Sequence, residues 1–159
     1  MLTRFTPRPS ELRDGPARTS FTNCAFARLD GNALFLGGRV RDARVVDSEF
    51  SYIGDTAVGL WGDTDEWDGR GGDQPRGTTL ERVVAHDIGL YEKQSSPLFQ
   101  AKAALTTARD CVFYNLPRAA VNFNDGFGGG NLIDHNVIVN SCRESGDHGD
   151  VNRSGVSHV

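Results

Sequence analysis

A short phrase recurs along the chain, made of a polar residue, two further residues and a hydrophobic residue. It occurs at Asn23–Phe26, Asp47–Phe50, Arg82–Ala85, Asp110–Phe113 and His135–Ile138. The hydrophobic residues that close successive phrases are 24, 35, 28 and 25 residues apart. A second apolar residue follows the first four phrases by three positions, at Leu29, Ile53, Ile88 and Leu116. Repetition at this period predicts a stack of similar coils, each resting on its neighbours.

Between the phrases the chain breaks into short apolar runs, such as Ala33–Leu36 and Val58–Trp61, separated by Gly, Asn and Asp. Runs of this length are too short for helices and suit strands. A period near 24 residues also fits leucine-rich repeats, but too few leucines stand at the required spacing. We therefore predict an all-β fold, a right-handed parallel β-helix of about five coils, with equivalent residues stacked about 4.8 Å apart.

The repeat also sets the expected organisation of the 159 residues. We expect residues 1–20 to form a tail or partial coil, residues 21–149 the β-helix, and residues 150–159 a divergent tail. Five rungs make a stack roughly 20–25 Å tall, whose ends expose apolar core unless they are capped. Neither terminus has the sequence of a cap, so we expect a fragment of a longer β-helix that is incomplete at its C-terminal end.

The net charge, the hydrophobic pattern and the cysteine count argue against several kinds of partner and cross-link. The net charge of −4 argues against a nucleic-acid partner. The sequence contains no run of 18 apolar residues, so we expect no membrane-spanning helix. The N-terminus lacks the apolar region of a secretory signal. Three cysteines are an odd count, which argues against a complete disulfide framework. Cys24 and Cys111 hold the same place in the phrase and are expected to be small core residues.

Longer motifs in the second half of the chain carry a family resemblance. They are Glu92–Ser96, Phe99–Lys102, Pro117–Asn131 and Cys142–Gly149. These motifs resemble a family of large right-handed β-helix proteins of the pectin-lyase-like superfamily, over roughly Pro16 to Gly149. In that family the motif ending at Gly149 continues Pro-Phe-Asn-Ser-Trp-Asp-Arg, whereas Asp150–Val159 follows here.

The superfamily includes polysaccharide lyases, glycoside hydrolases and epimerases. The resemblance therefore implies a polysaccharide or oligosaccharide partner, and it is compatible with an extracellular or secretory location. Fold alone does not determine the reaction.

Alternation along a strand predicts a polar ledge on the outside of the β-helix. If Phe123 points inward, its two asparagine neighbours point outward. Matching successive coils places Gln100 beside Asn124, and an offset of 25 residues places Asn122 beside Asp147. The expected ledge consists of Gln100, Lys102, Asn122, Asn124, Asp125 and Asp147. Amides and carboxylates in a row suit hydroxyl-rich ligands, although Asn and Asp at turns also bond backbone groups.

The candidate catalytic residues near this ledge are Asp125, Glu144, Asp147 and His148. Two carboxylates about 5–10 Å apart permit glycoside hydrolysis, and Asp125 and Asp147 come from adjacent coils. His148 or Lys102 could instead be the general base of a lyase. Arg118 and Arg143 are expected to stack, and could bind a uronate carboxylate or pair with acidic residues on the surface.

An acidic, Gly-rich insertion begins at Asp63 and lengthens one coil. Oxygen ligands at Asp63, Asp65 and Asp68 suggest Ca²⁺, but their spacing departs from an EF-hand loop. A solvated acidic loop is the simpler interpretation, and we expect no cofactor. Trp61 flanks the insertion and is either a platform for sugar stacking or a residue packed against the coil.

Two functions follow from these patterns. The first is a polysaccharide-interacting domain of a glycoside hydrolase or polysaccharide lyase, which requires the side chains of Asp125 and Asp147 to share one exposed cleft. The second is a non-catalytic structural or carbohydrate-binding β-helix, or an inactive truncated fragment. The departure from the family pattern after Gly149 favours the second function for this chain.

Overall fold

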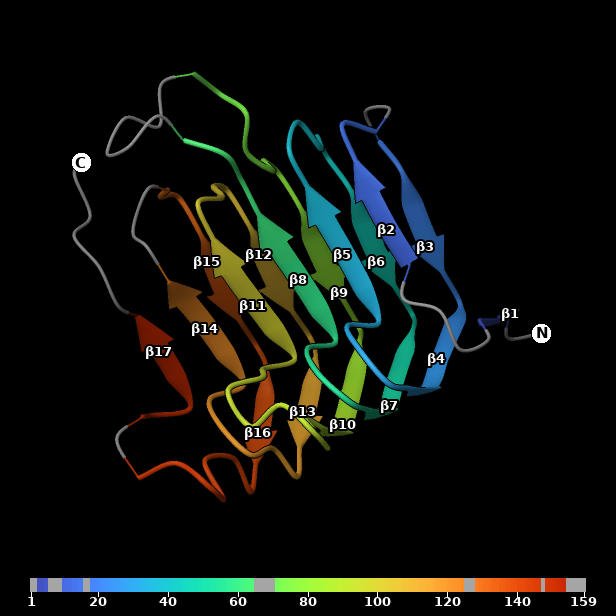
Figure 1. Ribbon diagram of the computed structural model, residues 1–159, viewed down its shortest axis with the longest axis vertical. Coiled ribbons are helices and arrows are strands. Elements are labelled where there is room, and N and C mark those ends of the chain that lie inside the picture. The colour runs from blue at the N-terminus through green and yellow to red at the C-terminus, as the bar shows by residue number, and fades with distance from the viewer. Residues whose placement is uncertain are drawn as a thin grey trace.

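The computed structural model describes residues 3–5, 10–15, 18–64, 71–124, 128–146 and 148–153. Within these residues the chain forms three parallel sheets of six, six and five strands. The chain passes through one strand of each sheet in every coil, so the product is a parallel β-solenoid of about five coils (Figure 1). This architecture agrees with the right-handed β-helix that the repeat predicts.

Sheet A contains β1 (Thr3–Phe5), β4 (Cys24–Leu29), β7 (Glu49–Ile53), β10 (Val84–Ile88), β13 (Val112–Tyr114) and β16 (Val137–Val139). Sheet B contains β2 (Ser10–Arg13), β5 (Leu34–Gly37), β8 (Val58–Trp61), β11 (Leu98–Ala101), β14 (Val121–Asn124) and β17 (Val151–Arg153). Sheet C contains β3 (Ser20–Thr22), β6 (Arg44–Val46), β9 (Thr79–Glu81), β12 (Thr107–Arg109) and β15 (Leu132–Asp134). Figure 1 shows the strands of sheet B side by side, from β2 at the blue end to β17 at the red end.

The recurring phrase builds the internal columns that the sequence predicts. Its closing residues pair in order across sheet A, from Phe26 through Phe50, Ala85 and Phe113 to Ile138. The rings of Phe26 and Phe50 stack with their centroids 4.6 Å apart, which is close to the spacing of neighbouring strands. The second predicted column pairs as Leu29, Ile53 and Ile88. Both columns lie in the buried core except at Ile138, which is partly buried and packs against it.

The polar residue that opens each phrase occupies a bend in left-handed backbone. These residues have φ between 49° and 56°, and they are Asn23, Asp47, Arg82, Asp110 and His135. A second set with φ between 48° and 58° follows each by five positions, at Arg28, Tyr52, Asp87, Asn115 and Asn140. Asn and Asp adopt this conformation more readily than other residues with a side chain. The polarity of the phrase therefore reflects a requirement of the backbone.

Cys24 and Cys111 are buried in equivalent places, as predicted. Side chains of the next coil accept hydrogen bonds from their backbone N–H groups, Ser48 Oγ at 3.1 Å and Asn136 Oδ1 at 2.9 Å. Burial raises the pKa of the Cys111 thiol to about 11, because a thiolate is poorly solvated in an apolar interior. This environment suits a small core residue.

Parallel pairing extends into residues 1–20, expected to form a tail or partial coil, and into residues 150–159, expected to form a divergent tail. Strands β1, β2 and β3 pair with β4, β5 and β6. Strand β17 pairs with β14. Within the described ranges we find no helix that is long and apolar enough to cross a membrane.

Candidate functional site

The outer face of sheet B carries aromatic side chains from three neighbouring strands. Strand register places Phe35 of β5, Gly59 of β8 and Phe99 of β11 in one outward-facing column. Trp61 follows Gly59 by two residues, points to the same face, and is 39% exposed. Its ring stacks on that of Phe99, with the centroids 6.2 Å apart and the planes 12° from parallel. The guanidinium of Arg13 lies 5.5 Å from the centroid of the Phe35 ring.

Gly59 leaves a groove between these rings. The strands that carry Phe35 and Phe99 flank β8, so their backbones are about 10 Å apart. A Cβ atom at Gly59 would approach Phe35 Cδ2 to 3.3 Å, which means that any larger side chain would occupy this space. The groove has a volume of about 270 Å³ and is lined by Asn32, Phe35, Asp55, Thr56, Gly59, Trp61, Glu92, Gln94 and Phe99.

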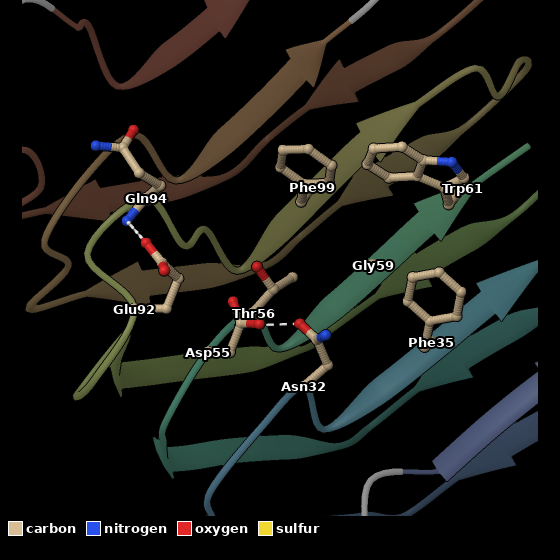
Figure 2. A pocket seen from close by; sticks show the side chains of 9 residues that line it. All are labelled: Asn32, Phe35, Asp55, Thr56, Gly59, Trp61, Glu92, Gln94 and Phe99. Atoms are coloured by element: carbon tan, nitrogen blue, oxygen red, sulfur yellow. Dashed lines mark hydrogen bonds between the residues drawn. The ribbon is translucent and has the colours of Figure 1, made fainter.

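The opposite end of the groove is polar, because it is built from the turns that precede β5, β8 and β11. Figure 2 shows the three rings to one side of the groove and Asn32, Asp55 and Glu92 to the other. Asn32 Oδ1 accepts a hydrogen bond from the Thr56 N–H at 3.2 Å. In the described part of the chain neither Asp55 nor Glu92 forms an ion pair with a basic side chain.

The segment 89–96 forms the wall of this polar end and is fixed by its backbone. Gly89 has φ of 65°, and its N–H donates to the carbonyl of Asp55 at 3.2 Å. The N–H of Glu92 donates to the carbonyl of Gly54 at 3.0 Å. The Ser95 hydroxyl donates to Asp55 Oδ1 at 2.7 Å. These bonds hold Glu92 next to the turn that carries Asp55.

Among the described residues the predicted ledge is interrupted at two buried positions, and Gln100 is the first. It pairs with Phe123, while Ala101 pairs with Asn124, so the expected pairing of Gln100 with Asn124 is wrong by one residue. Such a shift reverses the face to which a side chain points. Gln100 therefore points inward, in the column of two leucines, and is only 4% exposed. Its Nε2 donates to the carbonyl of Ala103 at 2.7 Å.

Asn122 is the second buried position. It shares the outward column of Phe99, but its side chain is fully buried. The neighbour of Asn122 in the next coil is Asn152, not Asp147 as expected. Asn152 Nδ2 donates to Asn122 Oδ1 at 3.0 Å. The expected offset of 25 residues fails because the segment before β17 lengthens this coil by five residues.

Arg118, Ser145 and His148 contact one another beside the groove. The Nη2 atom of Arg118 is hydrogen-bonded to His148 Nε2, and His148 Nδ1 lies 2.6 Å from Ser145 Oγ. A guanidinium can only donate, so Nε2 is the acceptor and Nδ1 carries the proton. In this tautomer the lone pair of His148 is already engaged, and the imidazole donates to Ser145. The role of His148 as a general base stays a prediction.

Two further contacts connect the groove wall to this cluster. Arg118 Nη1 donates to the Gln94 carbonyl at 3.3 Å, and Lys93 Nζ donates to Glu144 Oε1 at 3.1 Å. Three motifs that carry the family resemblance, Glu92–Ser96, Pro117–Asn131 and Cys142–Gly149, therefore meet at the polar end of the groove.

The other predicted site residues differ in exposure, or lie outside the described residues. The side chain of Arg143 is exposed, while Lys102 and Asn124 are half-buried at the ends of β11 and β14. Asp125 and Asp147, and with them the cleft required for the predicted hydrolase, lie outside the described residues. Of the suggested calcium ligands, Asp63 is exposed and both Asp65 and Asp68 lie outside the described residues. Across the described ranges no cluster of three His, Cys, Asp or Glu residues could hold a metal ion.

Neither protein-family models nor curated proteins nor solved structures matched the chain. The architecture therefore rests on the strand pairing of the chain itself, and the pectin-lyase-like superfamily remains a prediction.

Sequence reasoning identified Trp61 but missed the rest of the groove. The apolar runs did indicate the aromatic column. In successive coils an inward-facing aliphatic residue is followed directly by Phe35, Gly59 or Phe99, which must therefore face outward. Asp55 and Glu92 gave no such signal. They lie in turns of different length, and only the pairing of β8 with β11 brings these turns together.

Proposed function

We propose that the groove on sheet B binds a segment of a polysaccharide. The observation that carries this proposal is the stacked pair of Trp61 and Phe99, which faces Phe35 across Gly59. A sugar ring has an apolar C–H face that packs on an aromatic ring, and hydroxyl groups at its edge that need hydrogen-bond partners. The groove offers both, because its aromatic end adjoins the oxygen atoms of Asn32, Asp55 and Glu92.

The size of the groove supports an extended ligand. Sites that enclose a small molecule measure about 300–1,000 Å³, and this groove measures about 270 Å³. Such a volume suits one or two sugar units of a chain that continues beyond the groove. The rings come from short strands of one continuous sheet, so they are held in place before the ligand binds, which lowers the entropic cost of binding.

Calorimetric titration with oligosaccharides tests this proposal. We expect saturable binding that weakens about 3- to 10-fold in Trp61→Ala and in Phe99→Ala, the range that corresponds to one aromatic contact. Tyr52→Asn is the matched control, because Tyr52 is an exposed aromatic residue of sheet A outside the groove. Equal affinities for the wild type and both groove variants would refute the proposal.

Glycoside hydrolysis is a second candidate function, because two carboxylates, those of Asp55 and Glu92, line the same groove. Glycosidases use a carboxylate pair about 5–10 Å apart, one as general acid and the other as nucleophile or base. Product analysis after prolonged incubation tests this role. An enzyme releases shorter oligosaccharides and loses that activity in Asp55→Asn and in Glu92→Gln. If an oligosaccharide binds but yields no products, binding remains as the only function of the groove.

A further inference from the structure

The charge of the groove distinguishes between classes of polysaccharide. Among the nine described residues that line it, two carry carboxylates and none is Lys, Arg or His. The basic side chains that border the lining already have partners. Arg13, which contacts the Phe35 ring, pairs with Glu11. Lys93 pairs with Glu144, and Arg118 bonds the Gln94 carbonyl and His148. A uronate at the polar end of the groove would place its carboxylate next to Asp55 and Glu92, neither of which pairs with a basic side chain among the described residues, so the carboxylates would repel one another. The groove is therefore poorly suited to acidic sugars.

The aromatic end adds a second preference for positive charge. The face of an aromatic ring attracts cations, most strongly for Trp, and exposed cases are common in proteins. Arg13 already makes such a contact with Phe35, at 5.5 Å from the ring centroid. An oligosaccharide that spans the groove would place one ammonium group beside the carboxylates and a second one at the rings.

We propose that the groove selects amine-bearing glycans, such as glucosamine oligosaccharides, over neutral and acidic ones. This inference rests on the proposed function, because the sugar face is bound by Trp61 and Phe99. Asp55 and Glu92 then determine which sugar is preferred, through the charge on its nitrogen. N-acetylation removes that charge while it keeps the ring and the linkage, so the acetylated oligosaccharide is a matched neutral ligand.

The test compares three tetrasaccharides of equal length by calorimetry at about pH 5.5, where free carboxyl groups are ionised, and at low salt. They contain glucosamine, N-acetylglucosamine and galacturonate. We expect the glucosamine oligosaccharide to bind at least 10-fold more tightly than its acetylated counterpart, and the galacturonate oligosaccharide to bind weakest. The preference should shrink at 0.5 M salt, because exposed charges are then screened over about 4 Å.

Variants separate charge selection from sugar binding. Asp55→Asn combined with Glu92→Gln should reduce the preference for glucosamine to about two-fold, because the charged ligand loses more affinity than its acetylated counterpart. Asp110→Asn is the control, an exposed carboxylate outside the lining. If no tetrasaccharide binds, the proposed function itself fails.

Equal or tighter binding of the acetylated or galacturonate oligosaccharide would refute the charge preference and leave the proposed function standing. A tetralysine peptide is the last arm of the experiment. Binding as tight as that of glucosamine, and unchanged in Trp61→Ala, would mean that the groove recognises cationic peptides instead.

Discussion

The rings of Trp61 and Phe99 lie 6.2 Å apart and within 12° of parallel on adjacent strands of sheet B. One ring comes from the end of β8 and the other from the middle of β11, so the parallel register of these strands sets their spacing. Because Gly59 precedes Trp61 by two residues on the same face, the pair borders an open groove. The proposed function depends on this pair of rings and on the carboxylates at the polar end of the same groove.

Filling the space at Gly59 should abolish ligand binding without unfolding the protein. A β-branched residue is favoured in a strand, and a Cβ atom here meets Phe35 Cδ2 at a tight 3.3 Å. We expect Gly59→Val to weaken oligosaccharide binding more than 10-fold while the melting temperature stays within about 3 °C, since the added methyl groups project into the groove. Gly31→Ala is the control, because no atom lies within 4 Å of a Cβ atom there. Unchanged affinity in Gly59→Val would place the ligand elsewhere.

Truncation of Phe50 tests the internal column. Its ring is fully buried and stacks on Phe26 at 4.6 Å. Phe50→Ala should lower the free energy of unfolding by about 3–5 kcal/mol, because neighbouring coils cannot close the cavity. Leu132→Ala, at an exposed position, should change it by less than about 0.5 kcal/mol. Chemical denaturation followed by circular dichroism measures both. A small effect of Phe50→Ala would contradict the stacked core.

Leu105 tests the cost of left-handed backbone. It has φ of 58° and is 51% exposed, so an L side chain is strained there and contributes little burial. We expect Leu105→Gly to raise the free energy of unfolding by about 0.5–1 kcal/mol, although glycine adds entropy to the unfolded chain. Leu132→Gly, at an equally exposed strand position, should lower it by a similar amount. Destabilisation of both variants would show that the bend at Leu105 is unstrained.

Glu81 predicts a dependence of stability on pH. Hydrogen bonds from Arg109 and Arg82 lower the pKa of this carboxyl below its ordinary value of 4.5. A lowered pKa means that the folded protein binds fewer protons than the unfolded chain in the acid range. The stabilisation is therefore complete above the ordinary pKa and is lost as the pH falls through the lowered one.

Glu81→Gln should reduce stability at pH 7 and reduce its dependence on pH below 5. Thermal unfolding between pH 3 and pH 7 measures this difference. Glu11→Gln is the control, since Glu11 is exposed and pairs with the exposed Arg13, and exposed pairs contribute little. A wild type and Glu81→Gln variant that lose stability in parallel would contradict this role.

The architecture could be predicted because its signal is repeated in every coil. The residues that close the phrase recur every 24 to 35 residues, and parallel stacking brings them into one column, from Phe26 and Phe50 to Phe113. The same phrase also indicates where the backbone bends, because Asn23 and Asp110 are of residue types that tolerate positive φ.

The site could be predicted only in part, because it depends on register and on loops. A shift of one residue moved Gln100 from the outer face to the core. A longer segment before β17 brought Asn152 to Asn122 in place of Asp147. Asp55 and Glu92 lie 37 residues apart in sequence, and nothing in the repeat indicates that their turns adjoin. Only Trp61 was found in advance, because it stands beside an obvious insertion.

The indole N–H resonance of Trp61 gives the most direct test of oligosaccharide binding in this groove. The chain has two tryptophans, so Trp67→Phe leaves Trp61 as the source of a single indole signal in a ¹⁵N correlation spectrum. Titration with a glucosamine oligosaccharide should shift this signal saturably, with the same dissociation constant that calorimetry gives. A signal that stays in place at saturating oligosaccharide would contradict the account.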